Sequence, residues 1–224
     1  MKNVLLHTLV FIAAIFGSTV TGTQTGDPLP RNPAYVNALV ESLQGADSSE
    51  AADVFLIPFR KEIDSVARKC KLPASLLAAF IQEESQFDPF AIRTEPHYLK
   101  KRKVIAEARS WSRKHRGVPT YETELFLRAS SMGLMQPLGQ VAREQGFKAR
   151  FLSALIEPYN SLDEGAKHLR DKIIRYKGDT LSAISAYNQG NNRKKGGVFV
   201  NARYVYRVSV AWRVYEELFR REDD

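Results

Sequence analysis

Apolar residues recur at intervals of three and four positions through most of the chain, which is the spacing of amphipathic helices. The first such stretch runs from Pro33 to Gly45 and places Val36, Leu39 and Leu43 on one face. No apolar and polar alternation of strand length occurs, and there is no internal repeat, so we predict an all-α fold. Further helical stretches are expected at about 47–70, 73–87, 161–176, 179–187 and 202–219, with another that stops near Gly146.

The segment from Leu76 to Ile81 is apolar on nearly all sides, so we expect a buried helix at the centre of the domain. It leads directly into Glu83 and Glu84, and Asp88 before a proline is expected to end it. Successive helical residues point about 100° apart, so only one of the two carboxylates shares the buried face, and the periodicity slightly favours Glu84. Burial raises the pKa of a carboxyl group, which suits it to general acid catalysis near neutral pH. The alternative is that both carboxylates lie in solvent at a helix end.

The N-terminus has the pattern of a secretory signal peptide. Lys2 precedes an apolar run from Val4 to Phe16, and small and polar residues follow, with cleavage expected after Gly22. The run is shorter than the ~20 residues that a membrane-spanning helix needs, although an uncleaved anchor is the alternative interpretation. We therefore expect a signal peptide at 1–22, a lead-in and first helix at 23–46, and a single domain at 47–224. No membrane association is expected after cleavage.

The chain is basic, with 33 Lys and Arg against 25 Asp and Glu and a formal net charge of +8. Loss of Lys2 with the signal peptide leaves 32 basic residues and a net charge of +7. Such a charge favours anionic polymers, and export points to a bacterial envelope, in the periplasm or outside the cell, rather than to nucleic acid. A basic insert at about 93–129, with its charge concentrated between Leu99 and Arg116, could cover a cleft, bind anionic wall polymer or form a solvated helix.

Several kinds of chemistry lack support in the sequence. The histidines are scattered, with none at the spacing of a helical metal site, so no metal is predicted. The single cysteine, Cys70, excludes an internal disulfide and is expected to be a buried thiol. The nucleophile-elbow pattern and the phosphate-binding glycine loop are absent from the sequence, and no cofactor is predicted. Carboxylate chemistry is left as the leading option.

Three motifs occur in the order and rough spacing of a known family. They are Glu84-Ser85-Gln86-Phe87-Asp88-Pro89, Gly133-Leu134-Met135-Gln136 and Ala186-Tyr187-Asn188-Gln189-Gly190. With these motifs the chain resembles the catalytic domain of the soluble lytic transglycosylases, which belongs to the lysozyme-like superfamily and is similar to goose-type lysozyme. Shorter matches are Asn160, Gly165, Leu169, Gly178-Asp179, Tyr204-Val205 and Val208, and the similarity covers about Ile63 to Tyr215. It implies a lysozyme-like helical domain with a cleft around the central apolar helix.

The resemblance also implies a substrate, a reaction and a catalytic residue. The family cleaves the β-1,4 bond between N-acetylmuramic acid and N-acetylglucosamine in peptidoglycan, so glycan strands are the expected partner of a monomeric enzyme. Glu84 would protonate the glycosidic oxygen and then take the proton of the muramoyl 6-hydroxyl as a 1,6-anhydro ring closes. No second carboxylate is needed, because the N-acetyl group of the substrate can stabilise the cation, whereas most glycosidases use a pair.

The remaining site residues follow from the same resemblance. Met135 and Gln136 would line the sugar cleft, with Gln136 donating a hydrogen bond to an N-acetyl group. Tyr187 would orient Glu84 or the substrate, and Asn188 would lie at the floor of the cleft. Ser131 would hold the local backbone. For Met135 and Tyr187 ordinary core packing is the alternative.

The chain departs from the family pattern between its first two motifs. Residues 86–130 span 45 positions, and Glu95 within them could position a water molecule, as in muramidase-like relatives. Pro137-Leu138-Gly139 also replaces the usual continuation of the second motif. The alternatives to a transglycosylase are therefore a hydrolytic muramidase and a non-catalytic peptidoglycan-binding module.

Overall fold

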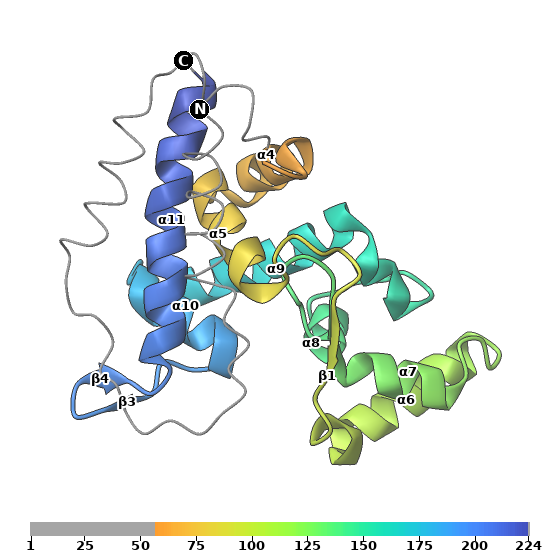
Figure 1. The fold of residues 1–224 in the computed structure, drawn as a ribbon. Coiled ribbons are helices and arrows are strands. Elements are labelled where there is room, and N and C mark those ends of the chain that lie inside the picture. The colour runs from red at the N-terminus through yellow and green to blue at the C-terminus, as the bar shows by residue number, and fades with distance from the viewer. Residues whose placement is uncertain (1–56, 224) are drawn as a thin grey trace, which may run out of the picture. The chain divides into compact units, whose positions relative to one another are not determined.

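A computed structural model describes residues 57–223 of the chain (Figure 1). The predicted signal peptide, lead-in and first helix lie outside these residues. The helices are α4 (Arg60–Cys70), α5 (Ala74–Glu84), α6 (Arg102–Lys114), α7 (Tyr121–Arg128), α8 (Gly139–Glu144), α9 (Pro158–Arg175), α10 (Thr180–Gln189) and α11 (Ala202–Asp223), with 3-10 turns at Tyr98–Lys100 and Leu152–Ile156. None of these helices combines the length and apolar character needed to cross a membrane.

Helix α5 is the buried centre that its composition predicts. Pro73 occupies the N-cap position, and all residues from 75 to 81 are buried. Figure 1 shows α11 running beside α5, and the two helices form the most extensive packing among the described elements. Two hydrogen bonds tie them together, from Trp212 Nε1 to Ser75 Oγ at 3.1 Å and from the Tyr215 hydroxyl to Gln82 Oε1 at 3.1 Å. The position of Glu84, the last residue of α5, is therefore fixed by α11.

Helices α9 and α10 pack against each other, and α9 also packs against α4. The helices predicted near 161–176, 179–187 and 202–219 are confirmed as α9, α10 and α11. Gly165 in α9 allows the close approach of the loop before α8, because a Cβ atom there would lie 2.5 Å from Cβ of Met135. Cys70 is a buried free thiol, as predicted.

The prediction that 47–70 forms one helix is wrong at its N-terminal side within the described residues. Helix α4 begins only at Arg60, because Phe59 adopts a left-handed backbone conformation with φ of 59°. The apolar patch at residues 125–127, to which we assign no helix from the sequence, is part of helix α7. Thr120 caps α7, its hydroxyl accepting a hydrogen bond from the Thr123 amide at 3.3 Å.

Short strands, absent from the prediction, join the two ends of the basic insert. Strand β1 (Ile92–Thr94) pairs antiparallel with β2 (Ser130–Met132), which sets Arg93 opposite Ser131. A second pair links β3 (Lys194–Lys195) to β4 (Val198–Phe199). Strands of two or three residues are too short to show an alternating pattern, which explains why the sequence does not reveal them.

A buried charge network holds the insert against α8. The Glu124 carboxylate of α7 accepts hydrogen bonds from Arg128 Nε and from Arg143 Nε, each at 2.9 Å. Arg128 also bonds Glu107 of α6 and Gln140 of α8, each at 2.9 Å. The basic insert is thus a packed pair of helices rather than an isolated solvated one.

Glu124→Gln should lower the free energy of unfolding by about 3 kcal/mol, because the buried Arg143 then loses its carboxylate partner and Arg128 keeps only that of Glu107. Urea denaturation measures the effect. Glu122→Gln, at an exposed position of the same helix, is the matched control and should change stability by less than about 0.5 kcal/mol. Equal stabilities of the two variants would contradict the role given to the network.

Candidate active site

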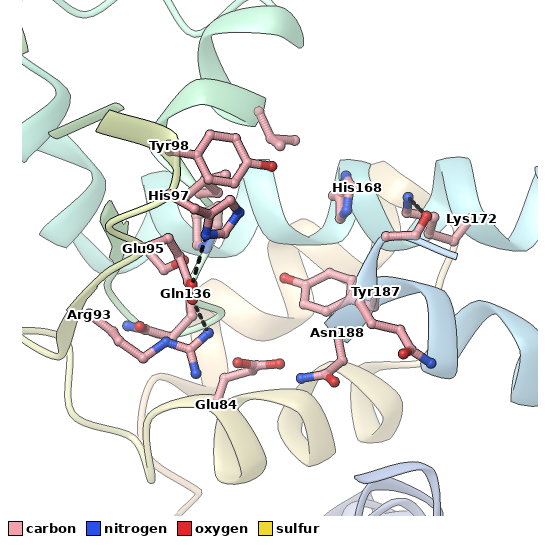
Figure 2. Close-up of a pocket in the computed structure, with 16 residues that line it drawn as sticks. Glu84, Arg93, Glu95, His97, Tyr98, Gln136, His168, Lys172, Tyr187 and Asn188 are labelled. Atoms are coloured by element: carbon pink, nitrogen blue, oxygen red, sulfur yellow. Dashed lines mark hydrogen bonds and ion pairs between the residues drawn. The ribbon is translucent and has the colours of Figure 1, made fainter. Parts of the chain in front are cut away.

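A pocket of about 360 Å³ opens beside the end of α5 (Figure 2). Its walls come from the end of α5, from β1 and the turn after it, from β2 and the loop before α8, and from α9 and α10. Of the residues predicted to form the site, those that line the pocket are Glu84, Glu95, Ser131, Gln136, Tyr187 and Asn188. Segments up to 106 positions apart in the sequence therefore meet around one cavity.

Glu84 presents its carboxyl group to this pocket from the last position of α5. The Tyr204 hydroxyl of α11 donates a hydrogen bond to Glu84 Oε1 at 2.5 Å. The pKa of Glu84 is raised to about 7, and the largest cause is burial. The hydrogen bond from Tyr204 opposes this rise, the negative charge of Glu83 adds to it, and the positive charge of Arg93 opposes it. A carboxyl group that holds its proton at neutral pH and borders a pocket can act as a general acid.

Glu83 has a different environment, although it is the neighbouring residue. Both its oxygens accept hydrogen bonds from Arg207 Nε at 2.9 Å, and Arg207 Nη2 makes a further contact. Its carboxylate is thus neutralised by a cation of α11, and it does not line the pocket. The geometry therefore separates the two carboxylates that the helical periodicity barely distinguishes.

Gln136 lines the pocket with its amide orientation fixed. Its Nε2 donates hydrogen bonds to the carbonyl oxygens of Ala91 at 2.9 Å and Gly133 at 2.8 Å. Only the nitrogen can donate to two carbonyls, so Oε1 is the atom left for a ligand. The predicted donation to an N-acetyl group is therefore wrong in direction, because Gln136 offers an acceptor.

Met135 and Tyr187 lie together but differ from their predicted roles. The Met135 side chain is fully buried and does not line the pocket, which agrees with the core-packing alternative. The Tyr187 hydroxyl donates to the Met135 carbonyl oxygen at 2.7 Å, so it holds the loop before α8 rather than Glu84. Its ring does border the pocket, with Phe80 edge-on at a centroid distance of 4.7 Å.

Asn188, Ser131 and Glu95 occupy three different walls. Asn188 accepts a hydrogen bond from Asn201 Nδ2 at 3.1 Å through its Oδ1, which leaves its own amide nitrogen for a ligand. Ser131 lies in β2, and its backbone also pairs with that of Leu138 in an isolated antiparallel β-bridge. Glu95 follows β1, and its carboxylate pairs with Arg93 at 2.7 Å and with His97 at 3.9 Å.

Four further residues of the pocket region are absent from the predicted site. Tyr204 contacts the acid directly, and Arg93, His168 and Lys172 line the pocket. Tyr204 belongs to the closing Tyr-Val element of the family pattern, and it begins an apolar face of α11 that continues at Val208 and Ala211. His168 and Lys172 are four residues apart on α9, and this spacing is the signal that could have brought them together as one face.

A helical domain that presents one partly buried carboxylic acid with a raised pKa to an open pocket has the arrangement of a lysozyme-like enzyme. The family model described as the transglycosylase SLT domain matches residues 62–198, which is more than half of the chain. The chain belongs to this family. It therefore carries the catalytic domain of a lytic transglycosylase, an enzyme that acts on the glycan strands of peptidoglycan.

Tyr204→Phe should shift the alkaline limb of the pH–activity profile to higher pH. In the wild-type protein the hydrogen bond from Tyr204 lowers the pKa of Glu84. Without this bond the pKa rises, and the carboxyl group keeps its proton to higher pH. Turbidity loss of purified peptidoglycan, followed from pH 5 to pH 9, measures the shift. Tyr206→Phe on the same helix is the control, and a profile of Tyr204→Phe that matches this control would contradict the contact.

Proposed function

We propose that the protein is an exported lytic transglycosylase that cleaves the β-1,4 bond between N-acetylmuramic acid and N-acetylglucosamine with a 1,6-anhydro product. The observation that carries this proposal is the contrast between the two carboxyl groups lining the pocket. Glu84 has a pKa raised to about 7 by burial and accepts a hydrogen bond from a neutral hydroxyl, whereas Glu95 is bound to a guanidinium. One acid with no free carboxylate partner suits a reaction in which the substrate supplies the nucleophile.

In the first half of the reaction, Glu84 donates its proton to the glycosidic oxygen. The bond between the muramoyl C1 and this oxygen breaks, and its electron pair leaves with the N-acetylglucosamine hydroxyl. The acetamido oxygen of the same muramoyl residue stabilises the positive charge at C1. Gln136 Oε1 accepts the acetamido N–H, because both hydrogens of its own amide are held by Ala91 and Gly133.

In the second half, the Glu84 carboxylate accepts the proton of the muramoyl 6-hydroxyl as that oxygen bonds to C1. The anhydro ring closes and Glu84 regains its proton, so no water is consumed. Tyr204 donates to the carboxylate between the two steps. A pKa of about 7 suits a group that first gives and then takes a proton at neutral pH.

A hydrolytic outcome requires a group that activates water, and Glu95 is the candidate that lines the pocket. Its Oε1 is bound to Arg93 at 2.7 Å, and its Oε2 faces His97. A carboxylate whose oxygens already face Arg93 and His97 is less free to orient a water molecule, which favours intramolecular attack by the substrate. The proposal of export is supported by the predicted signal peptide at 1–22 and by the basic charge, and the proposed site of action is the periplasm or the outside of the cell.

Glu84→Gln should reduce peptidoglycan lysis by about 10²–10⁴-fold, because the amide can neither donate nor accept the transferred proton. Binding to insoluble peptidoglycan should be retained. Loss of lysis together with retained binding distinguishes an enzyme from a non-catalytic binding module. Glu83→Gln is the matched neighbour and should keep most of the activity. Retention of more than a tenth of the wild-type rate by Glu84→Gln would refute the assignment.

The product distinguishes the transglycosylase from the muramidase. Mass spectrometry of the released muropeptides should show anhydro-muramoyl ends, lighter by one water than hydrolysed ends. Glu95→Gln should leave this product unchanged. Reducing muramoyl ends that disappear in Glu95→Gln would establish the hydrolytic alternative instead.

A further inference from the structure

Lys172 is a buried cation in the wall of the pocket. Its residue is only 8% exposed, yet the side chain lines the cavity beside Asn188 and Gly190. Its Nζ donates one hydrogen bond, to the Gly190 carbonyl oxygen at 3.2 Å. Within residues 57–220, no carboxylate lies within ion-pair distance of this ammonium group.

The buried guanidinium groups between the insert and α8 show the usual arrangement by comparison. Arg128 and Arg143 share the carboxylate of Glu124. A buried charge without a counter-charge is unfavourable, and an ammonium group has three donors, of which Gly190 takes one. Asp171, the preceding residue, is exposed and acts on Lys172 only through its charge, as does Arg175. The missing counter-charge of Lys172 therefore has room on the pocket side.

His168 extends the same face of α9 by one turn. Figure 2 shows His168 and Lys172 along one helix, on the other side of the pocket from Arg93. Burial, helped by the charge of Lys172, lowers the pKa of His168 to about 4, so its ring is neutral at pH 7. Tyr187 packs edge-on against it with the centroids 5.2 Å apart. The ring lines the pocket and can add a neutral N–H donor next to the ammonium group.

We propose that Lys172, assisted by His168, binds a carboxylate carried by the arm at O3 of a muramoyl residue, so that the pocket selects carboxylate-bearing strands over neutral N-acetylglucosamine polymers. This inference rests on the proposed function. The carboxylate has two possible sources: the lactyl group itself in strands without peptides, and the stem peptide where the lactyl group is amidated.

Lys172→Met tests the proposal, because it removes the charge and keeps the length of the side chain. The Lys172→Met variant and the protein with Lys172 intact are both prepared with Glu84→Gln, so that binding is measured without cleavage. The ligands are peptide-bearing glycan strands, amidase-treated strands with free lactyl groups, and chitohexaose, each titrated by calorimetry. We expect about 10- to 100-fold weaker binding of carboxylate-bearing strands and unchanged binding of chitohexaose. Loss with amidase-treated strands identifies the lactyl carboxylate, and loss with peptide-bearing strands alone identifies the stem peptide.

Arg170→Met, at an exposed position of the same helix, is the control for loss of one positive charge and should bind all three ligands normally. The melting temperature of Lys172→Met should not fall, because an uncompensated buried charge is removed. Lys172→Gln serves as a second variant of different shape. Equal weakening for chitohexaose and the carboxylate-bearing strands, or no weakening at all, would overturn the proposal.

Cleavage assays on the protein with Glu84 intact separate this inference from the proposed function. Selective binding without cleavage would refute the transglycosylase and leave the carboxylate site standing. If the protein cleaves peptidoglycan but Lys172→Met binds the three ligands with unchanged preference, the carboxylate site alone is refuted. Absence of binding to all three ligands would overturn both.

Discussion

The site depends on the different hydrogen-bond donors that α11 offers to two adjacent carboxyl groups at the end of α5. Tyr204 and Arg207 lie one helical turn apart on α11, and they contact Glu84 and Glu83 respectively. The neutral hydroxyl leaves Glu84 free to hold a proton, whereas the guanidinium keeps Glu83 as an ion-paired carboxylate. Because the two helices pack along their length, a change in their register would exchange or break both contacts. The chemistry of the pocket is thus set by helix packing rather than by the acid alone.

The wall on the other side of the pocket is formed where the two ends of the insert meet. Strands β1 and β2 join the ends of the insert, and this pairing brings Arg93 and Glu95 to the pocket. The insert is then anchored by Glu124 and its two arginines, which tie α7 to α8. Buried ion pairs of this kind contribute little net stability, but they fix one arrangement, because any other leaves a charge unpaired. These contacts hold the second wall against α8, despite the length of the insert.

The sequence was sufficient to predict the helices whose apolar faces are long. Helix α5 and its terminal carboxylates, and helices α9, α10 and α11, all have such faces. The three-residue strands have no detectable period, and the apolar patch of α7 is too short to show a helical one. The direction of the Gln136 amide and the partner of the Tyr187 hydroxyl depend on backbone carbonyls, whose positions no side-chain pattern encodes. Motif order located the site, whereas only tertiary contacts defined what each residue offers a ligand.

Two kinds of positive charge act in this protein, and they differ in range. The surface excess of basic residues attracts an anionic polymer from a distance, and salt weakens that attraction. It cannot select one sugar over another, because exposed charges far from the pocket act on the strand as a whole. A buried ammonium group acts over a few ångströms and is shielded from salt, so it responds to where a carboxylate lies along the strand. On the wall that holds Glu95, the cation is already neutralised by its carboxylate. The wall formed by α9 is therefore the side of the pocket where charge can fix the register of the glycan relative to Glu84.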